Sequence, residues 1–228
     1  MFLKQHCMLC GLASPNTLAL CQGCRADLPW IESGCLTCGL PLPQAAEQFQ
    51  CGECLAGESP LTLAVTPLFY QKPVSQMITA FKHRRGLAQG HLLAQLLADE
   101  IRDHYIDKEL PEVIIPVPLH WQRWMWRGYN QSAELGKQLS RVLGLPCQNH
   151  LLRRVRRTPS QQALSRKQRL YNLKGAFRIN HVIPYKRIAL LDDVVTTGAT
   201  TSEIARLLLK QGASEIHLWA IARTPSKM

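Results

Sequence analysis

The sequence predicts an α/β protein in which a mostly parallel β-sheet is flanked by helices and preceded by a small cysteine-rich domain. Short apolar segments alternate with amphipathic segments of helical period across residues 60–228, which is typical of a parallel sheet covered on both faces. Eight of the nine cysteines fall within residues 1–58, and one later apolar segment leads into two carboxylates and a turn rich in Thr and Gly. We therefore expect one domain over residues 1–58 and a second over residues 60–228.

The elements of the second domain can be assigned in order. Residues 61–70 form a strand interrupted at Pro67, which indicates an edge or a bulge because proline cannot donate to a strand ladder. A short helix over 74–81 precedes an amphipathic helix with Leu92, Leu96 and Ile101 on one face. The remaining elements are a strand over 113–115 closed by Pro116, a helix over 131–143 stopped by Gly144, strands over 176–179, 188–191 and 216–221, and a helix that follows the Thr-rich turn and ends near Gly212. Ligands of such sheets bind at the carboxyl ends of the strands, so Pro116 and Asp192 should lie at the same edge.

The cysteines occur as four Cys-x-x-Cys pairs in a domain too short to build a core of its own. Each pair can direct two thiolates at one tetrahedral ion, and a reduced cytosolic chain favours zinc over disulfides. Two Cys₄ ions taken in sequence order are the simplest arrangement, and an interleaved cross-brace is the alternative. Sites made only of cysteine are closed, so the zinc would be structural, with Trp30 and Phe49 packed around it. The expected metal ligands are Cys7, Cys10, Cys21, Cys24, Cys35, Cys38, Cys51 and Cys54.

The net charge of +11 is unevenly distributed along the chain. Residues 1–60 carry −3, which leaves +14 on residues 61–228, and residues 153–187 hold eleven Lys or Arg without one acidic residue. A block of one sign suggests a polyanionic partner, either nucleic acid or a heavily phosphorylated small molecule, and a solvated surface is the alternative. No apolar run approaches the length of a membrane span and no signal-peptide layout is present, so we expect a cytoplasmic protein without membrane insertion.

Residues 187–201 have the strongest chemical signature. They read as a buried strand, two carboxylates, a turn and the start of a helix, an arrangement in which backbone N–H groups and the helix dipole can bind a phosphate. Gly198 lets the backbone approach closely, and Asp192 and Asp193 can accept hydrogen bonds from sugar hydroxyls or hold a divalent cation through water. A turn that binds nothing is the alternative, but it leaves two carboxylates at a buried edge without a partner. The expected binding residues are Asp192, Asp193, Val194, Val195, Thr196, Thr197, Gly198, Ala199, Thr200 and Thr201.

This segment resembles the ribose-5-phosphate loop of type I phosphoribosyltransferases, in which apolar residues are followed by two acidic residues and Thr-Thr-Gly-Thr. Ala199 stands here at the last Thr of that pattern. The resemblance implies a type I phosphoribosyltransferase-like fold that binds phosphoribosyl pyrophosphate (PRPP) or a nucleoside monophosphate with Mg²⁺. It also implies a second loop for the pyrophosphate, for which Pro116, Val117 and Pro118 are candidates by position.

Transfer of the phosphoribosyl group from PRPP needs positive charge near the pyrophosphate, because this leaving group develops negative charge. Lys82 and Arg127 are candidates for that charge, and a plain surface position is the alternative for Lys82. The candidate catalytic residues are therefore Asp192, Asp193, Arg127 and Lys82.

The chain as a whole resembles the ComF/GntX family of phosphoribosyltransferase-like proteins. The motifs that carry the resemblance follow in order: the Cys-x-x-Cys pairs with residues 38–42, then residues 81–82, 116–118, 127–131, 162–164, 169–172 and 176–177, the PRPP loop, and residues 222–224. Tyr129 stands where Phe is commoner. The resemblance implies a cytoplasmic protein of natural competence, or of the use of external DNA as a nutrient, that acts on incoming single-stranded DNA beside a helicase-like partner.

Further features leave the function open. Three tryptophans alternate with arginines over residues 121–127, which suits base stacking on single-stranded DNA, although tryptophans also fill cores and subunit interfaces. No side chain is an obvious general base for a nucleobase acceptor. Three functions are therefore compatible with the sequence: a phosphoribosyltransferase with an unknown acceptor, a non-catalytic PRPP sensor that holds DNA, and an adaptor whose zinc domain recruits a helicase.

Overall fold

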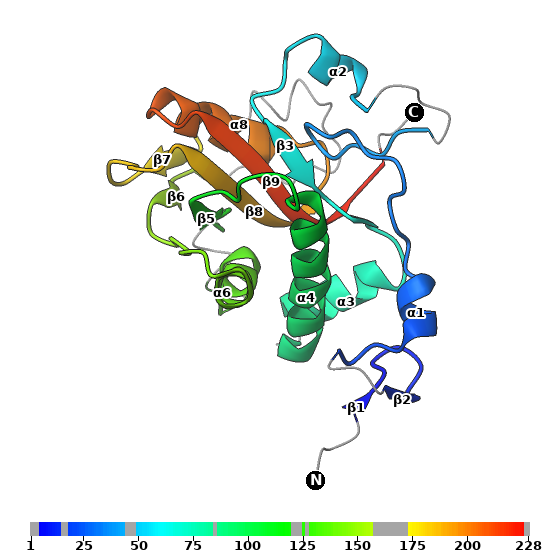
Figure 1. Cartoon of the computed structure of the whole chain (residues 1–228). Helices are drawn as coiled ribbons and strands as arrows, with labels where there is room; N and C mark the ends of the chain where they lie inside the picture. Colours follow the sequence, from blue (N-terminus) through cyan, green and yellow to red (C-terminus); the bar gives the residue numbers. More distant parts are fainter. Residues whose placement is uncertain are drawn as a thin grey trace.

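The computed structural model describes residues 5–14, 18–43, 49–83, 86–119, 125, 128–156 and 173–225. Within these residues, a five-stranded parallel sheet lies at the centre of the molecule (Figure 1). Its strands run in the order β3-β9-β8-β5, and β4 also pairs with β9. The strands are β3 (Leu63–Val65), β4 (Leu68–Phe69), β5 (Val113–Pro116), β8 (Arg187–Val195) and β9 (Glu215–Arg223). The predicted mostly parallel sheet is confirmed.

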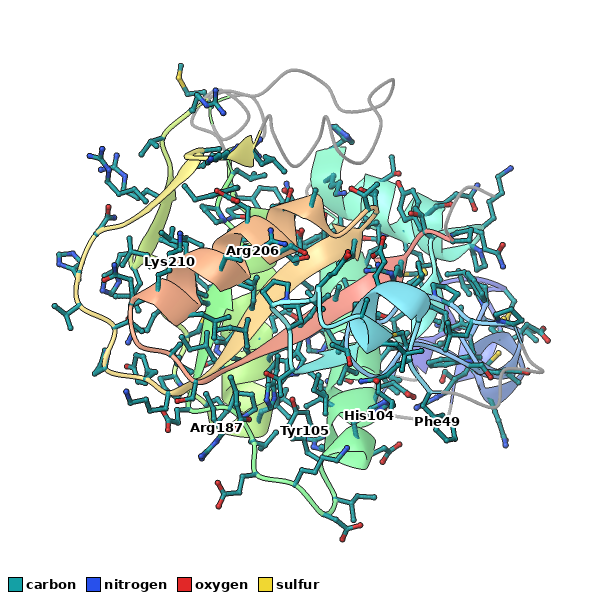
Figure 2. The ribbon with its side chains drawn as sticks, turned by 90° about the horizontal axis from the view of Figure 1, so that it is seen from above. Phe49, His104, Tyr105, Arg187, Arg206 and Lys210 are labelled. Carbon is teal, nitrogen blue, oxygen red and sulfur yellow. The ribbon has the colours of Figure 1, made fainter. Side chains whose placement is uncertain are left out.

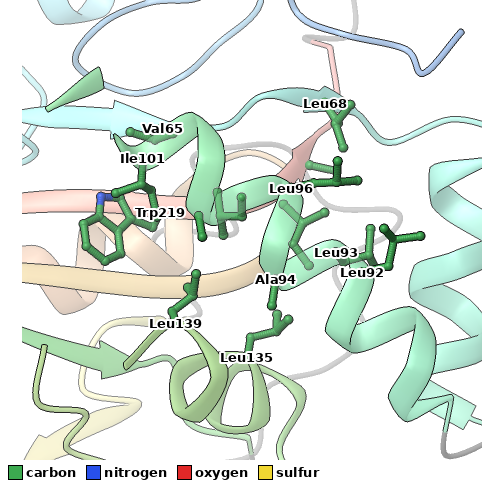
Figure 3. Packing of buried hydrophobic residues seen from close by; sticks show 14 of the residues in the cluster. Val65, Leu68, Leu92, Leu93, Ala94, Leu96, Ile101, Leu135, Leu139 and Trp219 are labelled. Atoms are coloured by element: carbon green, nitrogen blue, oxygen red, sulfur yellow. The ribbon is translucent and has the colours of Figure 1, made fainter. Parts of the chain in front are cut away.

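Helices cover both faces of this sheet. On one face, α3 (Val74–His83), α4 (Leu87–His104) and α6 (Gln131–Leu143) bury apolar side chains against the strands. Figure 3 shows this cluster, in which Ile101 of α4 and Leu139 of α6 lie beside Trp219 of β9. On the other face, α8 (Ala199–Lys210) buries Ile204 and Leu208. Strands β8 and β9 supply residues to both clusters, which explains why they are apolar almost throughout.

The N-terminal segment consists of small elements, and residues 29–36, which join two of them, lie along one edge of the sheet. They are β1 (Gln5–His6), β2 (Ala13–Ser14), α1 (Gln22–Ala26) and α2 (Gly52–Leu55). The backbone N–H of Ala64 in β3 donates to the carbonyl of Leu36 at 2.7 Å, and that of Ile31 donates to Pro67 at 2.8 Å. These bonds cover the edge formed by β3 and β4, which would otherwise present unpaired backbone groups.

Several element predictions are confirmed. The helix predicted over residues 131–143 has those bounds. Asn130 is its N-cap, and Gly144 is its C-cap, in the left-handed conformation with φ of 71°. The strand predicted over 61–70 is divided at Pro67 into β3 and β4, as its proline indicated.

Three expectations need correction. β8 extends to Val195, because β9 pairs with it as far as Arg223, so the two carboxylates lie inside the strand and not after it. The predicted strand over 176–179 appears as β7 (Phe177–Ile179), which pairs antiparallel with β6 (Leu152–Arg154) in a ribbon separate from the sheet. The side chain of Phe49 is 70% exposed and does not pack around a metal site (Figure 2). Phe49 contributes its backbone carbonyl instead, which accepts a hydrogen bond from the backbone N–H of Leu36.

A chain of hydrogen bonds joins the C-terminal end of α4 to β9. The hydroxyl of Tyr105 lies 2.5 Å from Nδ1 of His217 and accepts from Nε1 of Trp219 at 3.2 Å. Nε2 of His217 lies 3.1 Å from Oε2 of Glu215. Burial lowers the pKa of His217, so the neutral ring donates through Nε2 and accepts the tyrosine proton at Nδ1.

Tyr105→Phe is expected to lower the free energy of unfolding by about 1–3 kcal/mol, because it leaves the buried Trp219 N–H and His217 Nδ1 without this partner. Urea and thermal unfolding measure the change. Tyr185→Phe is the matched control, since the Tyr185 hydroxyl makes no hydrogen bond with another described residue. An equal loss of stability in both variants would contradict the prediction.

Candidate functional site

Two carboxylates lie at the carboxyl end of β8, and neighbouring helices contact both. Asp193 is 8% exposed, and its Oδ2 lies 2.8 Å from Nζ of Lys82 in the last turn of α3. Oδ1 of Asp192 accepts from the hydroxyl of Ser132 in α6 at 3.1 Å and from the backbone N–H of Asp193 at 2.9 Å. Elements far apart in the sequence, α3, α6 and β8, therefore meet at this acidic pair.

The acidic pair is costly to ionise in the free protein. Burial raises the pKa of Asp192 from 3.8 to about 7, and the negative charge of Asp193 acts in the same direction. The backbone N–H of Asp193, the charge of Lys82 and the hydroxyl of Ser132 oppose this shift without outweighing it. Carboxylate oxygens are the donors that Mg²⁺ prefers, so the pair fits a divalent cation held through water.

The end of β5 lies beside the same carboxylates. Pro116 pairs in register with Leu191 of β8, and the backbone N–H of Val117 donates to the Leu191 carbonyl at 2.8 Å. The side chain of Asn130 donates to the carbonyl of Val117 at 3.0 Å and accepts from the backbone N–H of Ser132 at 3.1 Å. Asn130 thus caps α6 and fixes its first turn against the 116–118 stretch, which lies at the predicted edge.

The turn after β8 has the backbone of an anion cradle. Gly198 has φ of +73°, a conformation that side chains rarely tolerate, and it begins α8 without a side-chain cap among the described residues. The first backbone N–H groups of this 12-residue helix can therefore point at a negative group. The hydroxyl of Thr201 donates to the Gly198 carbonyl at 2.9 Å, so it stabilises the turn itself.

The paired cysteines gather in two groups that follow the order of the sequence. Within each group all sulfur atoms lie within 4.8 Å of one another. Sγ of Cys10 lies 3.7 Å from Sγ of Cys21, and the same distance separates Cys38 from Cys51. Thiolates bound to tetrahedral zinc lie about 3.8 Å apart, so both groups fit zinc, and the interleaved alternative is excluded. We call Cys7, Cys10, Cys21 and Cys24 the first tetrad, and Cys35, Cys38, Cys51 and Cys54 the second tetrad.

The surroundings of Cys35 in the second tetrad favour its thiolate form. Hydrogen bonding from the thiol of Cys38, supported by the backbone N–H of Cys51, lowers the pKa of Cys35 to about 4 although burial opposes this. A thiolate is the form that binds metal, so this environment favours zinc.

Sequence reasoning assigned no role to several residues that the fold brings to the site. Ser132 and Asn130 contact the acidic pair and the 116–118 stretch, and Arg223 at the end of β9 lies against Gly198. Both residues stand at the start of the helix predicted over residues 131–143, and which strand lies beside that helix depends on the strand order. The predicted residues Arg127, Trp121, Trp124 and Trp126 lie outside the described part of the chain.

Comparison with known proteins places the chain in a family. Residues 1–55 match the family model of the double zinc ribbon domain, and residues 130–228 match that of the phosphoribosyl transferase domain. Competence protein F of Haemophilus influenzae is 42% identical over 97% of this chain and 98% of its own length. The chain belongs to the ComF/GntX family.

Two further ComF/GntX relatives span almost the whole chain. DNA utilization protein YhgH of Escherichia coli (strain K12) is 36% identical and covers 96% of both chains. Competence protein ComFC of Streptococcus pneumoniae is 25% identical over 95% of this chain and 99% of its own. Among the residues that the structure describes, no helix combines the length and apolar character needed to cross a bilayer.

Proposed function

We propose that this ComF/GntX protein binds PRPP with Mg²⁺ at the edge formed by Asp192, Asp193 and the Gly198 turn, and that it does so while handling single-stranded DNA. The observation that carries the proposal is an acidic pair, with Asp193 buried and Asp192 partly buried, placed before a helix N-terminus that has a left-handed glycine and no side-chain cap among the described residues. The relatives named for competence and DNA utilization support the link to DNA.

Each part of PRPP has a counterpart among the residues of the site. The backbone of residues 196–201 can hold the 5′-phosphate, and Asp192 and Asp193 can accept hydrogen bonds from the ribose hydroxyls. The diphosphate would lie toward Lys82 and the 116–118 stretch. Mg²⁺ held by the carboxylates through water would neutralise part of the diphosphate charge.

Calorimetric titration of zinc-replete protein with PRPP, with and without Mg²⁺, tests the proposal. We expect saturable binding that depends on Mg²⁺, and folded protein that binds no PRPP would contradict it. Measurement of pyrophosphate release in the presence of single-stranded DNA or nucleobases then separates two functions. Release indicates a phosphoribosyltransferase, and binding without release indicates a sensor.

The raised pKa of Asp192 predicts a pH-dependent stability difference. The pKa of Asp192 in the folded state, about 7, exceeds the ordinary value of 3.8, so between these two pH values the folded state binds more protons than the unfolded state. The contribution of Asp192 to stability therefore falls as the pH rises from about 4 to about 7. Asp192→Asn does not titrate, so its melting temperature should rise relative to that of the wild type between about pH 4 and pH 7. Thermal unfolding of both proteins at several pH values checks this. A pH-independent difference would contradict the assigned shift.

The ribbon formed by β6 and β7 carries the charge that suits single-stranded DNA. Arg153 lies directly opposite Arg178, both are exposed, and neither makes a hydrogen bond or ion pair with another described residue. Like charges placed opposite each other destabilise a ladder, and a phosphodiester backbone would supply the opposite charge.

The neighbouring cations show which part of the basic block faces outward. Cζ of Arg154 lies 5.5 Å from the ring centroid of Phe177, and Nη2 of Arg156 donates to the carbonyl of Lys174 at 2.9 Å. Both side chains therefore already contact neighbouring residues of the protein. α8, which packs beside β7, adds the exposed side chains of Arg206 and Lys210 (Figure 2). Arg157, the fourth arginine of the 153–157 cluster, lies outside the described residues.

Replacing Arg153 and Arg178 together with Gln is expected to weaken binding of a short single-stranded oligonucleotide. The slope of log affinity against log salt should become shallower by about 1.4, because two phosphate contacts are lost. Fluorescence anisotropy at several salt concentrations measures both effects. Lys137→Gln with Arg141→Gln on α6 removes the same charge from exposed positions and is the matched control. Equal effects of the two pairs would reject the ribbon as the DNA surface.

A further inference from the structure

A groove of about 310 Å³ lies between β7 and the C-terminal half of α8. Its apolar lining consists of Phe177 and Ile179 from β7, Val182 from the segment after it, and Leu207 from α8. Val182 is 87% exposed, so the groove presents apolar surface to solvent. Small-molecule sites in proteins measure about 300–1,000 Å³, so this groove has room for one flat ring system.

Polar side chains border the same groove. Asn180 is fixed there, because its backbone N–H donates to the carbonyl of Leu151 at 3.0 Å and its side chain donates to the carbonyl of His150 at 2.9 Å. The exposed ring of His181 contacts the ring of His150 edge-on, with centroids 5.9 Å apart. Gln211 is exposed, and its side chain makes no hydrogen bond with another described residue. An aromatic ring and an available amide therefore stand beside the apolar lining.

Cations flank the groove on both sides. Arg178 lines it from β7, and Arg206 and Lys210 occupy the row of the α8 surface next to the lining residues (Figure 2). All three are exposed, and none forms an ion pair with another described residue. The acidic residue of α8, Glu203, accepts from the backbone N–H of Gly175 at 3.1 Å. The charge around the groove therefore favours a negatively charged ligand.

A nucleotide of single-stranded DNA meets these requirements together. Its base has apolar faces that stack on aromatic rings and a polar edge that bonds to amides, and its phosphates pair with cations. An acidic peptide would satisfy the cations but would supply no base to stack on the exposed ring.

We propose that the groove between β7 and α8 receives a nucleobase of single-stranded DNA, with the adjoining phosphates held by Arg178, Arg206 and Lys210. His181 stacks on the base, and Gln211 bonds to its edge. The inference rests on the proposed function in handling single-stranded DNA, and it adds a base-binding site to the basic ribbon.

Two oligonucleotides of equal length test the groove, one intact and one with abasic positions at its centre. Fluorescence anisotropy of the full-length, zinc-replete protein measures both affinities. The wild type should bind the abasic strand about fivefold more weakly, because the stacked base is missing while the phosphates remain. His181→Ala should lose about the same factor with the intact strand and nothing with the abasic one. The salt dependence should stay unchanged, because no phosphate contact is lost.

Two variants control for the loss of the histidine. His181→Phe keeps an aromatic ring and should restore most of the affinity for the intact strand. His91→Ala removes an exposed histidine from α4, which packs on the opposite face of the sheet, and should bind both strands like the wild type.

Photocrosslinking locates the base directly. An oligonucleotide with one 5-iododeoxyuridine is irradiated with the wild-type protein, and the crosslinked peptides are identified by mass spectrometry. The crosslinks should fall within residues 177–182 or 207–211.

Other results overturn the proposal. Equal affinity of the wild type for the intact and abasic strands would show that phosphates alone are bound, so the DNA function would stand and the base site would fail. Crosslinks confined to other parts of the chain would lead to the same conclusion. Weaker binding of both strands in His181→Ala would show that this histidine supports the ribbon and does not stack on a base. If the wild type binds neither strand, the proposed DNA function itself fails, and the base site fails with it.

Discussion

Asp192→Asn is expected to weaken PRPP binding by about 10- to 100-fold without unfolding the protein. A hydrogen bond to a charged group contributes about 1.5–3 kcal/mol, and the substitution removes the charge that faces the ribose and the cation. The hydroxyl of Ser132 and the backbone N–H of Asp193 both donate to Oδ1, which an asparagine retains. Removing one of two neighbouring negative charges should also raise the melting temperature at neutral pH. A variant that is more stable and yet binds less is a signature that simple structural damage does not produce.

Calorimetry and thermal unfolding of the same sample check both effects. Asp103→Asn is the matched control, since Asp103 is exposed on α4 and away from the acidic pair. Asp193→Asn should bind even less, because it also breaks the ion pair with Lys82. Unchanged PRPP affinity in both site variants would show that the acidic pair does not bind the ligand.

Cys35→Ser is expected to lower the zinc content from two ions to one and to unfold the loop around the second tetrad. Structural zinc contributes about 10–16 kcal/mol in small zinc domains, and this part of the chain has little core to replace it. Cys35 is 1% exposed, so a serine there also leaves a buried hydroxyl among thiols. The segment between Ser33 and Glu58 should become the main site of proteolysis.

Elemental analysis and limited proteolysis mapped by mass spectrometry measure these changes. Cys147→Ser is the matched control, because Cys147 lies outside both tetrads and burial raises the pKa of its thiol to about 11. It should keep two zinc ions and the wild-type cleavage pattern. Full zinc content in Cys35→Ser would refute the assignment of the second tetrad.

Patterns with a local physical origin could be predicted from the sequence. The four cysteine pairs, the carboxylates before the Thr-rich turn, and the helix stop at Gly144 depend on neighbours within a few residues, so periodicity and spacing reveal them. The full length of β8 did not follow from composition, because its last residues are held by pairing with β9.

The sequence by itself determined most of the succession of helices and strands along the chain, the eight candidate metal ligands and the segment that forms the Gly198 turn. Only the tertiary structure decided what surrounds that turn. Lys82, Ser132 and Arg223 come from three elements that meet because of the strand order β9-β8-β5 and the packing of α3 and α6 on one face. Strand order and helix docking depend on contacts between distant segments, and no local pattern in the chain encodes them.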